Sequence, residues 1–254
     1  MNFFFGIKSN DLTCKITIPK FQNFGKSKED IKVYEAVAEE NIWKIKETTC
    51  RYNKNFFFVE DNFIENNKIF FLAKEHEINV MKNQNELIKI NNFTNTFPAF
   101  RSNLRLSIPN KGFSSYQSEY PFEMTKKKGS ILSLLNMLLN INSDNNFIFF
   151  KNIYFKPRHD DSNLYFIDIK KKKIVDKVKI KFNFLNEKKV EKKIIKKDIF
   201  IYSEECLGIP LYVSIKNNHI SFEHTHPPHH YILSGDRYKT VANIKNEFKK
   251  IVNK

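Results

Sequence analysis

Short runs of β-branched and aromatic residues alternate with clusters of Asn, Lys, Asp and Gly along most of the chain. The alternation is clearest where Val178, Ile180 and Phe182 are separated by single lysines. A two-residue period is typical of strands with one buried face, and the polar clusters indicate turns between antiparallel strands. We therefore expect a mainly β protein, built as an antiparallel β-sandwich or open barrel. The segments with this character are 31–38, 42–48, 55–60, 68–73, 101–108, 147–155, 164–169, 175–183, 198–203, 209–215 and 219–226.

Two segments have a helical pattern instead. Residues 129–141 are rich in leucine and follow a candidate cap at Ser130, which predicts a short helix in the middle of the chain. Residues 237–252 place apolar residues at spacings of three and four between Val241 and Ile251, with lysines on the other side. This pattern predicts an amphipathic C-terminal helix that packs on a sheet.

A chain of 254 residues with 41% hydrophobic residues can form one β-rich domain. A soft boundary at 91–98 would leave residues 99–254 carrying the site. No apolar run approaches the ~20 residues that span a bilayer, so we expect no membrane span. The first residues do not resemble a secretory signal, and three scattered cysteines favour reduced thiols over a disulfide framework. These features favour a cytoplasmic protein.

The formal net charge of +15 suggests an anionic partner, but the composition weakens this argument. The chain contains 38 Lys and only 5 Arg, with 26 Phe and 6 Gly, as expected when A/T-rich codons accumulate. Such drift makes exposed surfaces basic without selection for binding, and specific nucleic-acid recognition is not indicated. An Arg, Gly or His retained against this drift is correspondingly more informative.

Five of the seven histidines lie in the segment 219–230. With a two-residue period, Ile220 and Phe222 lie on the core-facing side of a strand, and His224 and His226 continue that side. Imidazoles on a buried face are costly unless they are hydrogen-bonded or coordinated to a metal. The opposite side of the same strand carries His219, Ser221 and Glu223.

Two histidines at this spacing can share one metal ion, with a third ligand supplied by His229, His230 or Asp236. Three histidines, or two with Asp, suit zinc, whereas two histidines with one carboxylate suit iron. The sequence does not choose between the two divalent metals. An alternative interpretation is that the histidines cap the end of a sheet through hydrogen bonds and bind no metal.

The run His224-Thr225-His226-Pro227, with Ser234 seven residues after the proline, resembles the zinc-site motif of the JAB/MPN metalloproteases, which remove ubiquitin-like tags. In that family the acidic ligand lies one position later than Asp236 does here. Further strands also follow the motif in that family, whereas this sequence continues into one predicted helix. The resemblance covers about a dozen residues, and we do not assign the chain to the family.

A second polar stretch covers residues 101–130. Arg101 and Arg105 lie on one side of a predicted strand and could hold a phosphate or carboxylate through paired hydrogen bonds. Tyr116 and Gln117 could hydrogen-bond to a sugar or stack on it. Long polar segments on a β scaffold commonly carry binding groups. An ordered loop fixed by its tyrosines is the alternative.

Two hypotheses follow. The first is a metal-dependent hydrolase or lyase acting on a small polar or anionic substrate at the histidine cluster 219–230. Glu119, Glu205 or His159 would be its general base, and Arg237 would help Arg101 and Arg105 to hold the substrate. The second is a non-enzymatic β-sandwich protein that binds a glycan or polyanion through a basic surface bearing tyrosines. The sequence does not indicate the oligomeric state.

Overall fold

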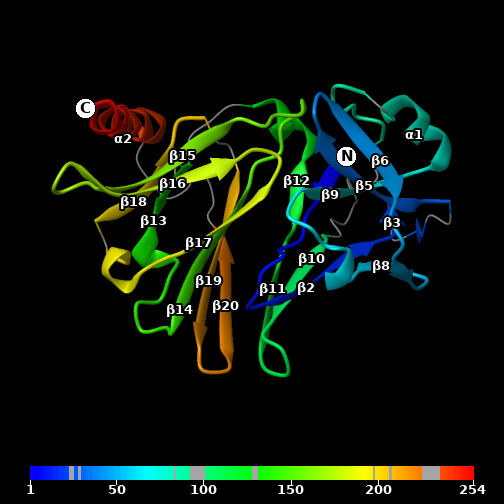
Figure 1. Cartoon of the computed structure of the whole chain (residues 1–254), viewed down its shortest axis with the longest axis horizontal. Helices are drawn as coiled ribbons and strands as arrows, with labels where there is room; N and C mark the ends of the chain where they lie inside the picture. The colour runs from blue at the N-terminus through cyan, green and yellow to red at the C-terminus, as the bar shows by residue number, and fades with distance from the viewer. Residues whose placement is uncertain are drawn as a thin grey trace.

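The computed structural model is mainly β, with antiparallel sheets and two α-helices among the residues it describes. The four larger sheets of this part of the chain follow one another as a propeller-like ring (Figure 1). The predicted antiparallel β class is confirmed. The predicted sandwich or open barrel is wrong, because the strands form several sheets with different packing partners. The described residues are 1–22, 26–27, 30–82, 84–91, 101–127, 131–196, 198–205, 208–224 and 235–254.

The first two sheets come from the N-terminal half of the chain. The first sheet has the order β12-β1-β9-β5-β6, and the second has the order β11-β10-β2-β8-β7. The first consists of β1 (Asn2–Phe4), β5 (Lys32–Glu39), β6 (Ile42–Glu47), β9 (Lys68–Ala73) and β12 (Glu119–Pro121). The second consists of β2 (Thr13–Pro19), β7 (Arg51–Tyr52), β8 (Phe56–Val59), β10 (Asn103–Ser107) and β11 (Phe113–Tyr116). A hairpin of β3 (Phe21–Gln22) and β4 (Lys26–Ser27) and the helix α1 (Glu75–Met81) accompany them.

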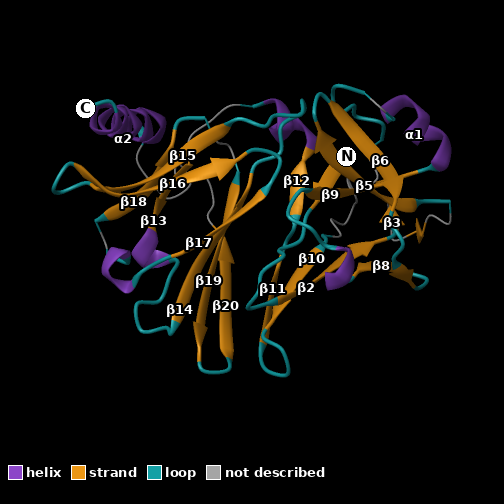
Figure 2. Cartoon of the chain, viewed as in Figure 1, coloured by secondary structure: helices purple, strands orange, loops and turns teal. Residues whose placement is uncertain are grey.

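The other two sheets come from the C-terminal half. The third sheet has the order β13-β18-β15-β16, and the fourth has the order β17-β14-β19-β20. The third consists of β13 (Ile131–Leu134), β15 (Asp161–Asp168), β16 (Lys173–Lys181) and β18 (Ile199–Ser203). The fourth consists of β14 (Asn145–Lys151), β17 (Leu185–Lys189), β19 (Ile209–Lys216) and β20 (His219–His224). Figure 2 shows how little helix interrupts these strands.

The two central strands of the fourth sheet, β14 and β19, are buried on both faces. Phe147 and Phe149 of β14 project into a core shared with the first and second sheets. Ile148 and Phe150, the alternate residues, project into a second core shared with the third sheet. A strand with apolar partners on both sides needs a continuous apolar run, which the sequence Phe-Ile-Phe-Phe supplies. The two halves of the chain are thereby packed against each other.

The helix α2 (Arg237–Val252) covers the outer face of the third sheet. Phe248 is fully buried, with its ring centroid 5.5 Å from that of Phe200 and 5.6 Å from that of Tyr202. The predicted amphipathic helix at 237–252 is confirmed. Among the described helices, none is long and apolar enough to cross a membrane.

A strand lies within each segment predicted above, although β14 ends at Lys151 and leaves 152–155 outside it, but the helix predicted over 129–141 is wrong. Residues 131–134 form β13, which pairs with β18, and one 3₁₀ turn follows at Leu135–Met137. Leu135 and Leu139 are buried in the core of the third and fourth sheets. Strand pairing and burial therefore outweigh the helical propensity of the leucines. Residues 92–98 of the proposed boundary lie outside the described residues.

Candidate functional site

The histidine strand β20 is oriented as its two-residue period predicts. Phe222 is buried in the first core, and His224, on the same side, is half-buried. The His224 ring lies 4.2 Å from the Tyr116 ring, between centroids, and the Tyr116 hydroxyl is 3.0 Å from Nε2 of His224. Because Tyr116 belongs to β11, this contact joins the edge of the second sheet to the edge of the fourth.

A second contact at the same junction explains a retained glycine. The backbone N–H of Gly112, in the β10–β11 turn, donates to the carbonyl of Asn218 in the β19–β20 turn at 3.1 Å. A Cβ atom at position 112 would lie 2.3 Å from that carbonyl oxygen, which is far inside van der Waals contact. Only glycine permits the two turns to approach this closely.

The metal-site prediction is only partly covered by the structure. His226, His229 and His230 lie outside the described residues. Asp236 is described and is the N-cap residue of α2, where its side chain makes no capping hydrogen bond. Within the described residues, no group of three His, Cys, Asp or Glu side chains is arranged to hold a metal ion. The divalent zinc or iron site, and the metal-dependent enzyme built on it, stay predictions.

Arg101 and Glu119 form an ion pair with each other and do not contribute to the histidine cluster. The guanidinium Nη1 of Arg101 is 2.8 Å from Oε2 of Glu119, and the second carboxylate oxygen accepts the backbone N–H of Ser102 at 2.9 Å. Glu119 is buried, whereas Arg101 is largely exposed. The ion pair and the Ser102 hydrogen bond hold the chain in place just before β10. The Glu119 carboxylate, which the sequence suggests as a general base, therefore has a structural role.

The other proposed catalytic groups lie elsewhere. His159 is exposed, and its Nε2 is 2.6 Å from the backbone carbonyl of Glu40. Glu205 is exposed and pairs with Arg158 at 3.2 Å between Oε2 and Nη2. Arg237 is the first residue of α2, which covers the outer face of the third sheet, away from the second sheet. None of these three side chains has a described contact with His224.

The second sheet presents a solvent-facing surface of a different kind. Strands β10 and β2 bury Leu104, Leu106, Cys14 and Ile16, so the alternate residues point outward. We call the resulting surface the basic–aromatic face. It comprises the side chains of Lys15, Arg51, Phe58, Arg105 and Phe113, which come from five adjacent strands.

Cations and aromatic rings are interleaved on this face. The guanidinium carbon of Arg105 lies 3.7 Å from the centre of the Phe113 ring, and Nζ of Lys15 lies 4.5 Å from the centre of the Phe58 ring. Phe113 is 58% exposed, so part of its ring is open to solvent beside the Arg105 guanidinium. Exposed or half-exposed Thr17, Asn103 and Ser115 lie on the same face and add hydrogen-bonding groups.

One carboxylate limits the positive charge of the face. Glu60 lies 3.1 Å from Nζ of Lys15 and also pairs with Arg51. Burial raises the pKa of Glu60, but hydrogen bonds from Arg51 and Lys15 outweigh this effect and hold the pKa below its usual range. Arg105 forms no ion pair within the described part of the chain. Its guanidinium is thus the cation of this face that is available to a ligand.

Sequence reasoning found Arg105 but missed the rest of the face. Lys15, Arg51 and Phe58 lie in segments that look generic when considered separately. The relevant signal is their register: Arg105 faces Lys15, Thr17 faces Phe58, and Phe58 faces Arg51 across neighbouring strands. Strand order is a property of the folded sheet, and no local pattern reveals it.

Lys151 is a further polar group that sequence reasoning missed. It ends β14, its side chain is fully buried, and its amino group donates to the backbone carbonyls of Asn66 and Lys68. Burial lowers the pKa of Lys151 to about 7. Because Asn66 and Lys68 precede and begin β9, the contact ties the fourth sheet to the first.

Comparison with protein-family models, with curated protein sequences and with solved structures finds no match for this chain.

Proposed function

We propose that this protein binds single-stranded nucleic acid, without sequence preference, on the basic–aromatic face. The observation that carries the proposal is the stacking of Arg105 on the exposed ring of Phe113, repeated by Lys15 on Phe58. Proteins that bind single strands combine cations for the phosphates with aromatic rings on which bases stack. The glycan- or polyanion-binding hypothesis is thereby narrowed to one ligand class.

The geometry of the sheet suits an extended ligand. Five strands about 4.8 Å apart give a face about 19 Å wide, which accommodates a few nucleotides. The N–H groups of a guanidinium lie in its own plane. They can therefore still donate to a phosphate when the guanidinium is stacked on a ring. Asn103 and Ser115 provide donors and acceptors for bases without imposing one sequence. The net charge of +15 adds long-range attraction.

Fluorescence anisotropy with a labelled dT oligonucleotide, and separately with a U oligonucleotide, tests the proposal at several salt concentrations. Binding should weaken with salt, with a slope of roughly −0.7 for each phosphate that the protein neutralises. Phe113→Ala should weaken binding by about tenfold and leave the slope unchanged, because it removes a stacking surface and no charge. Arg105→Ala should weaken binding and make the slope less negative by about 0.7.

Lys179→Ala is the matched control, since Lys179 is an exposed lysine of β16 in the third sheet. It should bind like the unmodified protein. Equal binding by all three variants would exclude this face as the site. Retained salt dependence with no effect of Phe113→Ala would instead indicate a general polyanion site without base stacking.

A further inference from the structure

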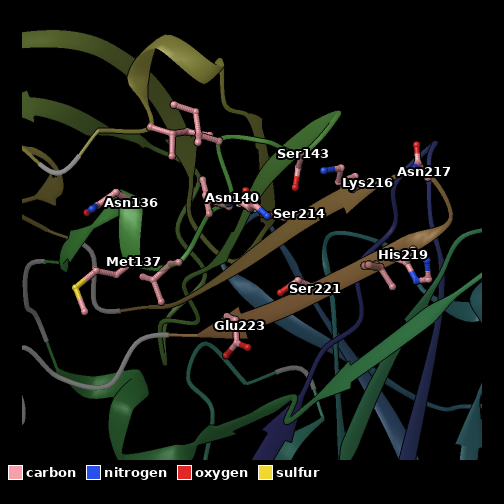
Figure 3. Close-up of a pocket in the computed structure, with 15 residues that line it drawn as sticks. Asn136, Met137, Asn140, Ser143, Ser214, Lys216, Asn217, His219, Ser221 and Glu223 are labelled. Carbon is pink, nitrogen blue, oxygen red and sulfur yellow. Dashed lines mark hydrogen bonds between the residues drawn. The ribbon is translucent and has the colours of Figure 1, made fainter.

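A groove of about 1000 Å³ follows the outer side of β19 and β20, away from the basic–aromatic face. Figure 3 shows Ser221 and Glu223 of β20 along one wall, with Lys216, Asn217 and His219 at the hairpin end. These β20 residues alternate with Ile220, Phe222 and His224, which point to the first core. The groove is therefore the second face of the histidine strand.

The two ends of the groove carry opposite charge. Glu223 faces Tyr212 across the strand pair, whereas His219 faces Lys216 four residues further along. At about 3.3 Å per residue, the carboxylate end and the lysine end are separated by roughly 13 Å. Glu223, Lys216 and His219 are all exposed and are the titratable side chains among those that line the groove.

The opposite wall is apolar and exposed. Met137 and Ile141, from the segment that follows β13, are 70% and 49% exposed. Large apolar side chains at the rim of a polar groove indicate a surface that a ligand covers. Between the ends, the hydroxyl of Ser214 donates to Oδ1 of Asn146 at 2.6 Å and accepts the backbone N–H of Asn140 at 3.0 Å. The side-chain hydroxyl of Ser221, opposite Ser214, has no hydrogen-bond partner within the described residues.

We infer that this groove binds a short extended peptide of about four residues with free termini. Its amino group would lie at Glu223 and its carboxylate at Lys216 and His219. Four extended residues span about 13 Å, which matches the separation of the charges. Apolar side chains in the middle of the peptide would cover Met137 and Ile141, and Ser221 would hydrogen-bond to its backbone.

The test uses the full chain and the peptide Ala-Leu-Leu-Ala, with binding followed by NMR chemical-shift titration. Acetylation of the peptide amino group should weaken binding by about threefold to fivefold, as expected for an exposed ion pair. Glu223→Gln should weaken binding of the free peptide by the same factor. Acetylation should then have no further effect on the variant, because the two changes remove one interaction.

The lysine end of the groove is tested by an independent double-mutant cycle, which combines Lys216→Met with amidation of the peptide carboxylate. Lys177→Met, at an exposed lysine of β16, is the control and should bind the free peptide normally. Absence of binding up to millimolar peptide would overturn the inference. Equal loss on acetylation in the unmodified protein and in Glu223→Gln would also overturn it, because the amino group would then lie elsewhere. Neither result bears on nucleic-acid binding, which uses a different sheet.

Discussion

The hydroxyl of Tyr116 and the imidazole of His224 lie 3.0 Å apart across the junction of the second and fourth sheets. Their ring centroids are 4.2 Å apart, so the contact combines a hydrogen bond with ring packing. The two residues are 108 positions apart in the chain. His224, which the sequence suggests as a metal ligand, therefore also links the two halves of the protein.

Tyr116→Phe should separate the two components of this link. The substitution keeps the ring and removes the hydroxyl, so the free energy of unfolding should fall by about 1 kcal/mol. Tyr116→Ala removes the ring as well and should cost about 3 kcal/mol. Urea unfolding followed by circular dichroism measures both values. If Tyr116→Phe unfolds at the same urea concentration as the unmodified protein, the hydrogen bond does not contribute to stability.

Gly112→Ala should destabilise the same junction from the other side. The new methyl group would collide with the carbonyl of Asn218, and the turns must move apart at a cost of about 1–3 kcal/mol. Gly235→Ala is the control, since no atom of the described residues lies within 4 Å of a Cβ at that position. Thermal unfolding should show a lower midpoint for Gly112→Ala alone. Equal midpoints would mean that the two turns can move apart without loss of stability.

Lys151 predicts a pH dependence of stability. Its pKa is about 7 in the folded protein and near 10.5 in the unfolded chain, so the unfolded chain binds more protons between these values. The free energy of unfolding should therefore rise with pH, by about 2–3 kcal/mol between pH 7 and pH 9. Above this window the contributions of Cys14 and Tyr202 act in the opposite direction, because burial raises each pKa to about 12.

Lys151→Met isolates this effect. The variant replaces the amine by an apolar group of similar length, and its stability should change less between pH 7 and pH 9 than that of the unmodified protein. Urea unfolding at the two pH values gives the difference directly. A parallel pH dependence in both proteins would assign the rise to other groups, such as the amino terminus, whose pKa burial also lowers.

The metal-site prediction has a direct measurement. The natively purified protein should contain about one equivalent of zinc or iron, as determined by mass spectrometry. The double variant His224→Ala/His226→Ala should lose the metal while its circular dichroism is retained. A metal-free protein whose double variant unfolds more readily would instead support the hydrogen-bonding interpretation of the cluster. In that case the Tyr116 contact would account for His224.

Sequence reasoning succeeded where one strand determines the pattern. The alternation at Val178, Ile180 and Phe182 matches an exposed lysine face and a buried face in β16 and the turn after it. The two-residue period in β20 placed His224 on the core side. In each case burial of one face imposes the period on the sequence, so the sequence can be interpreted locally.

It failed where partners are distant in sequence. The leucines of 131–134 have high helical propensity, but their backbone groups pair with β18, about 70 residues away. Lys151 lies within the strand predicted over 147–155, and nothing in that segment indicates its partners Asn66 and Lys68, which lie in the other half of the chain. The basic–aromatic face depends on the order of five strands, which tertiary packing decides.

The position of the fourth sheet has a consequence for folding. Because β14 contributes Phe147 and Phe149 to one core and Ile148 and Phe150 to another, neither core can form fully before this sheet does. The two halves of the chain should then unfold in one cooperative transition, and a fragment ending near residue 127 would expose the apolar surface that Phe147 and Phe149 normally cover. Such a fragment would be expected to aggregate, so the protein is best expressed and studied as the whole chain.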